Sequence, residues 1–198
     1  GKPKSPRALI LAPTRELAQQ IHESIVDYAK HQNSTSNVVY GGVKINRQIL
    51  RLQNGVDILV ATPGRLLDLY NHRAVQFTSV EILVLDEADR MLEMGLSEDV
   101  MAIAKTCSTD RQTLLFSATL EPEGIRHLIK QVVLGDAEEI TVKEVANSIE
   151  QQMILADDVK HKEKLLIALL EKSPFEKVVI FTNTKAKAVQ LDNVLRYN

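Results

Sequence analysis

Short apolar runs recur along the first part of the chain, separated by longer amphipathic stretches. The runs are rich in Ile, Leu and Val, and they lie at residues 8–11, 37–40, 57–60, 81–85 and 112–116. Their apolar residues are consecutive rather than alternating, which is typical of strands covered on both faces of a sheet. The alternation of such runs with helical stretches predicts an α/β fold, in which a parallel sheet carries helices on both faces.

The stretch between the first two runs shows the helical pattern most clearly. Over residues 15–31, Leu17, Ile21 and Ile25 recur at helical spacing, and Tyr28 continues the stripe. A stripe of this kind predicts a helix that packs its apolar side against the sheet.

The pattern changes near residue 140. Residues 136–142 predict one last strand, and the polar residues 143–149 have no clear period, so we interpret them as a linker. Beyond the linker, two strands and two helices are predicted to alternate, at residues 151–156, 160–172, 177–182 and 185–197. We therefore expect residues 1–142 to form one domain and residues 150–198 to form the start of a second.

Composition and charge narrow the class of protein. The 198 residues are 44% hydrophobic and 25% charged, which excludes disordered and fibrous chains. The longest apolar run, residues 165–170, is far shorter than the roughly 20 residues of a membrane span. The single cysteine, Cys107, is expected to be a buried bystander, and its isolation is typical of a reducing, cytoplasmic location. With a net charge of −2, nucleic-acid binding would depend on locally placed arginines and backbone amides.

Acidic residues directly follow the apolar run at residues 81–85. Asp86 and Glu87 are thereby placed at the carboxyl edge of the predicted sheet, where α/β folds bind ligands. Asp86 is a candidate ligand of Mg²⁺ through water, because this ion keeps much of its hydration shell. Glu87 is placed to orient or deprotonate a water for phosphoryl transfer. The alternative is that both carboxylates only stabilise the start of the next helix.

Two hydroxyl groups are predicted to reach the same edge. Ser117 and Thr119 follow the run at residues 112–116, and Asp89 lies on the first turn of the helix that follows the acidic pair. A hydrogen bond from either hydroxyl to Asp89 would link the two loops. The alternative is that the hydroxyls only cap the helical segment that begins near Glu121.

Three further loops at this edge combine features that suit a polyanionic backbone. The free amides of a first helical turn bind anions, glycine allows close approach, and arginine binds phosphate. The residues of these loops are Pro13, Thr14, Arg15 and Glu16, then Gly42, then Thr62, Pro63, Gly64 and Arg65. Contacts to a backbone carry no base information, so the binding would be independent of sequence. For each loop alone, ordinary capping and turn chemistry is the alternative.

Five short motifs occur in one order along the chain: PTRELAQQ, GG, ATPGR, VLDEAD and SAT. Together they resemble the DEAD-box ATP-dependent RNA helicases of superfamily 2, and residues 178–184 are similar to the first motif of that family's second domain. The resemblance covers residues 7–198. Residues 89–95 and 116–120 look most like bacterial members, of the SrmB type that is linked to ribosome assembly.

The resemblance implies two RecA-like domains that close over ATP and single-stranded RNA and bend the RNA, so that a duplex cannot continue. Asp86 would position Mg²⁺ on the phosphates of ATP, and Glu87 would orient the hydrolytic water. Asp89, Ser117 and Thr119 would couple the nucleotide state to domain closure. RNA, ribosomal RNA in particular, would lie along Pro13, Thr14, Arg15, Glu16, Gly42, Thr62, Pro63, Gly64 and Arg65.

The chain departs from the family pattern at both ends. It contains no G-x-x-x-x-G-K-[ST] loop and none of the arginine motifs of the second domain, so we expect the 198 residues alone not to hydrolyse ATP. We expect them to work with upstream and downstream segments of the same full-length protein. The missing phosphate-loop strand should leave neighbouring strands without a partner and an apolar groove open.

Two other functions stay open. One is a helicase-derived RNA-binding scaffold without ATPase activity, against which the intact DEAD string argues. The other is a DNA-directed helicase or ATPase of the same superfamily, against which PTRELAQQ together with DEAD argues.

Overall fold

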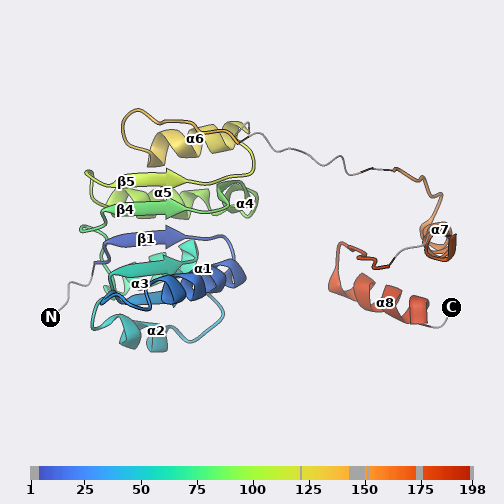
Figure 1. Ribbon diagram of the computed structural model, residues 1–198, viewed down its shortest axis with the longest axis horizontal. Helices are drawn as coiled ribbons and strands as arrows, with labels where there is room; N and C mark the ends of the chain where they lie inside the picture. The colour runs from blue at the N-terminus through green and yellow to red at the C-terminus, as the bar shows by residue number, and fades with distance from the viewer. Residues whose placement is uncertain (1–4, 121, 143–149, 151, 173–175, 197–198) are drawn as a thin grey trace. The chain divides into compact units, whose positions relative to one another are not determined.

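The computed structural model describes residues 5–120, 122–142, 150, 152–172 and 176–196. The chain divides into two compact units, Gly1–Ile140 and Thr141–Asn198. In Figure 1 the first unit is a sheet with helices packed against it, and the second contains two helices.

Five parallel strands form the sheet of the first unit, in the order β2–β3–β1–β4–β5. They are β1 (Ala8–Leu11), β2 (Ser36–Val39), β3 (Ile58–Ala61), β4 (Ile82–Leu85) and β5 (Gln112–Leu115). In the central register, Leu11 lies opposite both Ala61 and Leu85, and Leu85 lies opposite Leu115. All five carboxyl ends therefore meet at one edge. The five predicted strands are confirmed, with ends that differ by at most one residue.

Helices cover both faces of this sheet, as the sequence predicts (Figure 1). They are α1 (Arg15–Tyr28), α2 (Ile45–Leu52), α3 (Pro63–Asn71), α4 (Ala88–Glu93), α5 (Ser97–Thr106) and α6 (Glu123–Val132). Successive residues of a strand point to opposite faces. Leu9 and Leu11 accordingly lie in the larger core with α2 to α6, and Ile10 lies in the smaller core with α1. The expected α/β fold is confirmed.

Helix α1 is shorter than its pattern predicts. It ends at Tyr28, and the amide of the next residue, Ala29, donates to the carbonyl of Ile25. The apolar stripe also ends before Tyr28. Leu17, Ile21 and Ile25 pack against the smaller core, whereas Tyr28 is 85% exposed. Assigning Tyr28 to the packed stripe was therefore wrong.

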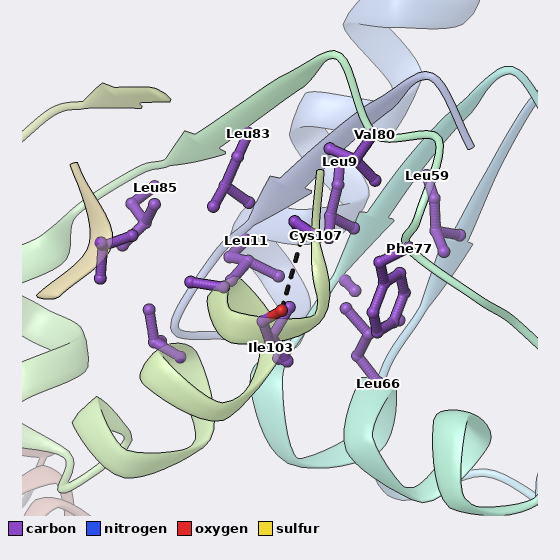
Figure 2. Close-up of a cluster of buried hydrophobic side chains, with 14 of the residues drawn as sticks. Leu9, Leu11, Leu59, Leu66, Phe77, Val80, Leu83, Leu85, Ile103 and Cys107 are labelled. Atoms are coloured by element: carbon purple, nitrogen blue, oxygen red, sulfur yellow. Dashed lines mark hydrogen bonds between the residues drawn. The ribbon is translucent and has the colours of Figure 1, made fainter. Parts of the chain in front are cut away.

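The larger core buries the only cysteine of the chain, as expected (Figure 2). The Cys107 thiol donates a hydrogen bond to the carbonyl of Ile103 over 3.4 Å. Burial raises the pKa of this thiol from its ordinary value of 9.0 to about 11, although the nearby Arg111 partly opposes the shift. A buried, protonated thiol is a poor nucleophile, so the side chain acts as a small apolar filler.

The free energy of unfolding is expected to fall at alkaline pH because of Cys107. The unfolded chain ionises this thiol at its ordinary pKa, whereas the folded chain keeps it protonated to about pH 11. The contribution of the thiol to stability is therefore complete below the unfolded pKa and is lost as pH rises through the folded pKa. Urea unfolding should show the stability difference between wild type and Cys107→Ala shrinking from about pH 9 upward. A difference that does not change with pH would contradict this assignment.

The sheet is open at both of its outer strands, β2 and β5, but has no gap between its strands. All five strands are hydrogen-bonded in one continuous sheet, so the expectation of unpartnered strands applies only to its two outer strands, β2 and β5. Near the β5 edge, apolar side chains are partly exposed: Ile82 of β4 by 38%, Leu114 of β5 by 36%, and Phe116, just after β5, by 55%. The expected apolar groove stays a prediction.

The second unit contains the two predicted helices, α7 (Val159–Lys172) and α8 (Lys185–Arg196). Neither helix has a fully buried residue. No helix within the described ranges is long and apolar enough to cross a membrane.

Three predicted strands are absent from the described residues of the chain. Residues 136–142, 152–156 and 177–182 form no strand there, and side chains such as Val142 and Phe181 are largely exposed. The physical reason is that a strand needs hydrogen-bonded neighbours, and an isolated pair is at best marginal in water. Residue 151 and the predicted linker at residues 143–149 lie outside the described residues.

Candidate functional site

The acidic pair lies at the carboxyl edge of the sheet, between β4 and α4, as predicted. The amide of Asp86 donates to the carbonyl of Leu11 at the end of β1, over 3.0 Å. The amide of Ala88, just beyond the pair, donates to the carbonyl of Phe116 after β5, also over 3.0 Å. Hydrogen bonds to both neighbouring strand ends therefore fix the backbone of Asp86 and Glu87.

Glu87 has a left-handed backbone conformation, with φ 51° and ψ 54°. This conformation costs a residue other than glycine roughly 1–2 kcal/mol, and such strain concentrates at functional sites. The Glu87 amide donates to Oδ1 of Asp86 over 3.0 Å, and the Glu87 side chain is exposed. The fold thus holds an exposed carboxylate in a strained position, which the sequence pattern alone does not reveal.

The predicted link between Asp89 and the loop after β5 is not made by Ser117. The Ser117 hydroxyl donates its one proton to the carbonyl of Thr119, over 2.7 Å. Oδ1 of Asp89 accepts instead from the amide of Arg90, the next residue, over 3.0 Å. Each loop is thus closed by its own local hydrogen bond. The coupling role of these three residues stays a prediction.

The first of the three backbone-binding loops follows β1. Thr14 caps α1, because its Oγ1 accepts from the amide of Leu17 over 3.2 Å. Pro13 is buried, whereas Arg15 and Glu16 are exposed on the first helical turn. The cap confirms the local prediction, and Arg15 is available to a ligand.

The second and third loops are tied together by Arg65. Its Nη1 donates to the carbonyl of Val43, over 3.0 Å, and its Nε lies 3.7 Å from Oδ2 of Asp68. The side chain of Arg65 is only 12% exposed. Arg65 therefore supports the loop after β2 in this structure, and its predicted contact to phosphate stays untested.

The remaining residues of these loops shape the backbone. Pro63 occupies the first turn of α3, and Thr62 precedes it as the N-cap without a side-chain hydrogen bond. A Cβ at Gly64 would lie 3.4 Å from Oδ2 of Asp99, which is tight. Gly42 has a φ of +81°, so a side chain there would be strained although the space around it is open.

Sequence reasoning missed Tyr40, which follows β2 directly. The guanidinium carbon of Arg15 lies over its ring, 4.8 Å from the centroid. Nε2 of Gln19 donates to its hydroxyl over 3.2 Å, and Nε2 of Gln48 donates to its carbonyl over 3.0 Å. The only signal in the sequence is the position of Tyr40 immediately before Gly41, and no spacing rule connects it with Arg15.

The donor set at Asp86 fits a magnesium ion that arrives with a nucleotide. Within the part of the chain that the structure describes, no three His, Cys, Asp or Glu side chains group together to hold a metal. Asp86 offers carboxylate oxygens at the sheet edge, and Mg²⁺ is commonly bound by one or two carboxylates together with waters and substrate phosphates. Asp86 could therefore hold the ion through water.

The chain matches the sequence model of the DEAD/DEAH box helicases over residues 1–128. The chain belongs to this family. Among curated relatives, the ATP-dependent RNA helicase DBP3 of Lodderomyces elongisporus is 39% identical over 100% of the chain and 39% of its own length. The RNA helicase CrhR of Synechocystis is 41% identical over 96% of the chain and 39% of its own length. The chain thus spans about two fifths of these helicases.

Solved structures agree with this assignment to the helicase family. A DEAD box protein from Methanococcus jannaschii is 38% identical, with a TM-score of 0.67, over 97% of the chain and 51% of its own. A hypothetical ATP-dependent RNA helicase from Sulfolobus tokodaii is 32% identical, with a TM-score of 0.59, over 96% of the chain and 55% of its own. The parallel sheet with helices on both faces is therefore RecA-like.

The relatives do not single out a bacterial subgroup. They include a yeast protein, a cyanobacterial protein and the ATP-dependent RNA helicase RhlB of Xanthomonas axonopodis, which is 40% identical over 93% of the chain and 33% of its own length. The resemblance to the SrmB type is not confirmed by this spread.

Proposed function

We propose that the whole protein is an ATP-dependent RNA helicase that binds the RNA backbone without sequence preference and separates short duplexes locally. One observation carries this function: the carboxyl ends of all five strands meet at one edge. That edge carries the acidic pair after β4 and, beside it, the loops after β1, β2 and β3. A single edge thus combines the carboxylates of a phosphoryl-transfer site with loops suited to a phosphate backbone.

In this proposal the two carboxylates of the acidic pair have different roles in ATP hydrolysis. ATP with Mg²⁺ supplies the phosphoanhydride bond and neutralises charge that develops on the phosphates. Asp86, whose backbone amide donates a hydrogen bond to the carbonyl of Leu11, holds the ion through water. Glu87 orients the attacking water and accepts its proton, a role for which an exposed carboxylate on a rigid backbone is suited.

The other residues of the site bind RNA and transmit the nucleotide state. Arg15 and the amides at the start of α1 contact phosphates, and the loops that contain Gly42 and Arg65 hold the next stretch of the strand. Asp89, Ser117 and Thr119 respond to domain closure. Residues 150–198 form the start of the second RecA-like domain in this proposal, and upstream and downstream segments complete the site.

The substrate and location are further parts of the proposal. The names of the relatives DBP3, CrhR and RhlB support RNA as the partner. Ribosomal RNA is the substrate that the SrmB-type resemblance suggests. The single cysteine supports a cytoplasmic location, because disulfide-forming compartments favour paired cysteines.

Phosphate release tests the function directly. The whole protein is incubated with ATP and Mg²⁺, alone, with single-stranded RNA, or with DNA of the same sequence. We expect RNA to stimulate release and DNA to have little effect, and we expect the 198-residue chain alone to release none. RNA binding without hydrolysis by the whole protein would favour the scaffold, and equal stimulation by DNA would favour a DNA-directed enzyme.

A further inference from the structure

Tyr40 lies where elements from three parts of the sequence meet. It joins the end of β2 to the exposed turn of Gly41, Gly42 and Val43. Gln19 on α1 holds its hydroxyl, and Gln48 on α2 holds its carbonyl. The residue therefore ties α1 and α2 to one loop at the carboxyl edge of the sheet.

The ring of Tyr40 also holds Arg15. The guanidinium carbon lies over the ring at 4.8 Å from its centroid, within the range of a cation–π interaction. Among the described residues, no carboxylate forms an ion pair with Arg15, and the side chain is exposed. A contact with a ring face uses the charge of the guanidinium but none of its N–H donors. Arg15 is thus held in place while its donors stay available to an anion.

The turn after Tyr40 is anchored at both of its ends. Gln48, which is only 4% exposed, donates to the carbonyl of Tyr40, and Arg65 donates to the carbonyl of Val43. Between these anchors, Gly41 and Gly42 are exposed at the edge where Arg15 lies. One aromatic residue therefore positions both an arginine and a glycine turn on the same surface.

We propose that Tyr40 is a positioning residue of the RNA site, whose ring holds Arg15 in the orientation that binds an RNA phosphate. The inference rests on the proposed RNA binding and adds to it the residue that acts through Arg15. Ordering a long, mobile side chain in advance saves the entropy that binding would otherwise cost. Loss of the ring should therefore weaken binding although Tyr40 itself contacts no phosphate.

The first test measures the affinity of the whole protein for a single-stranded RNA at several salt concentrations. Tyr40→Leu is expected to bind roughly three- to tenfold more weakly, and the magnitude of its salt slope should fall by about 0.7, which corresponds to one phosphate contact. Tyr40→Phe keeps the ring and should recover most of the affinity and the slope. Tyr28→Leu, at an exposed tyrosine far along α1, is the matched control.

A second test separates this role from a structural one. Phenylalanines with increasing fluorination are placed at position 40. Fluorination lowers the negative electrostatic potential of the ring face with little change of shape. RNA affinity should fall stepwise with fluorination when Arg15 is present, and should not change in the Arg15→Ala background. This series replaces Tyr40→Leu if that variant does not fold.

Three results would overturn the proposal. An affinity that does not respond to fluorination excludes the ring, and equal losses with and without Arg15 exclude action through that residue. A wild type that binds no RNA would refute the proposed function as well, whereas the first two results refute only the role of Tyr40.

Discussion

Glu87→Gln in the whole protein is expected to lower RNA-stimulated ATP hydrolysis by about 10²- to 10⁴-fold, the usual contribution of a general base. The amide is nearly the same size as the carboxylate but cannot accept a proton from water. Glu87 is exposed and its backbone is held by the flanking hydrogen bonds, so neither the left-handed conformation nor the fold should change. Binding of ATP and RNA should survive, and steady-state phosphate release measures the loss.

A matched control lies at the other end of α4, the helix that follows the acidic pair. Glu93, at the end of α4, is exposed, and its carboxylate lies 3.2 Å from Nη1 of Arg90. Glu93→Gln makes the same chemical change without touching the site, so its rate should stay close to wild type. Equal rates for Glu87→Gln and wild type would refute the proposed role of Glu87. Equal losses in both variants would assign the effect to α4 rather than to the water-orienting carboxylate.

The strands of the first unit could be predicted because each contains consecutive apolar residues and has a partner in the sheet. The run that becomes β1 is buried by helices on both faces, so its pattern and its environment agree. The segment at residues 177–182 has the same pattern but forms no strand, and its side chains are exposed. An apolar run therefore predicts that a segment can form a strand. Whether it does so depends on a neighbouring strand, which the local sequence does not reveal.

The sequence could predict the site only as far as strand ends place residues at one edge. That rule located Asp86, Glu87 and the loop of Arg15, because every parallel strand delivers its carboxyl end to the same side. It could not predict side-chain partners, which depend on distances between elements. The hydroxyl of Ser117 donates within its own loop rather than to Asp89. Arg15 lies over the ring of Tyr40, although no regular spacing in the sequence connects the two residues.

Phe77 has the largest fully buried side chain among the described residues of the larger core. It is completely buried, and its ring stacks on Tyr70 with centroids 5.4 Å apart. Figure 2 shows it between Leu59 of β3 and Leu66 of α3. Phe77→Ala should lower the free energy of unfolding by about 3–5 kcal/mol, because the lost contacts leave a cavity that the packed strands cannot close.

Urea unfolding followed by circular dichroism would measure this loss, and Phe116→Ala provides the matched control. Phe116 is 55% exposed, and the substitution keeps both of its backbone hydrogen bonds, from its amide to the carbonyl of Leu85 and from the amide of Ala88 to its carbonyl. Its loss should therefore be under about 1 kcal/mol. Equal losses at the two positions would mean that burial at Phe77 does not determine stability. A large loss at Phe77 alone would show that burial between β3 and α3, rather than apolar surface at the outer strand, determines the stability of the sheet.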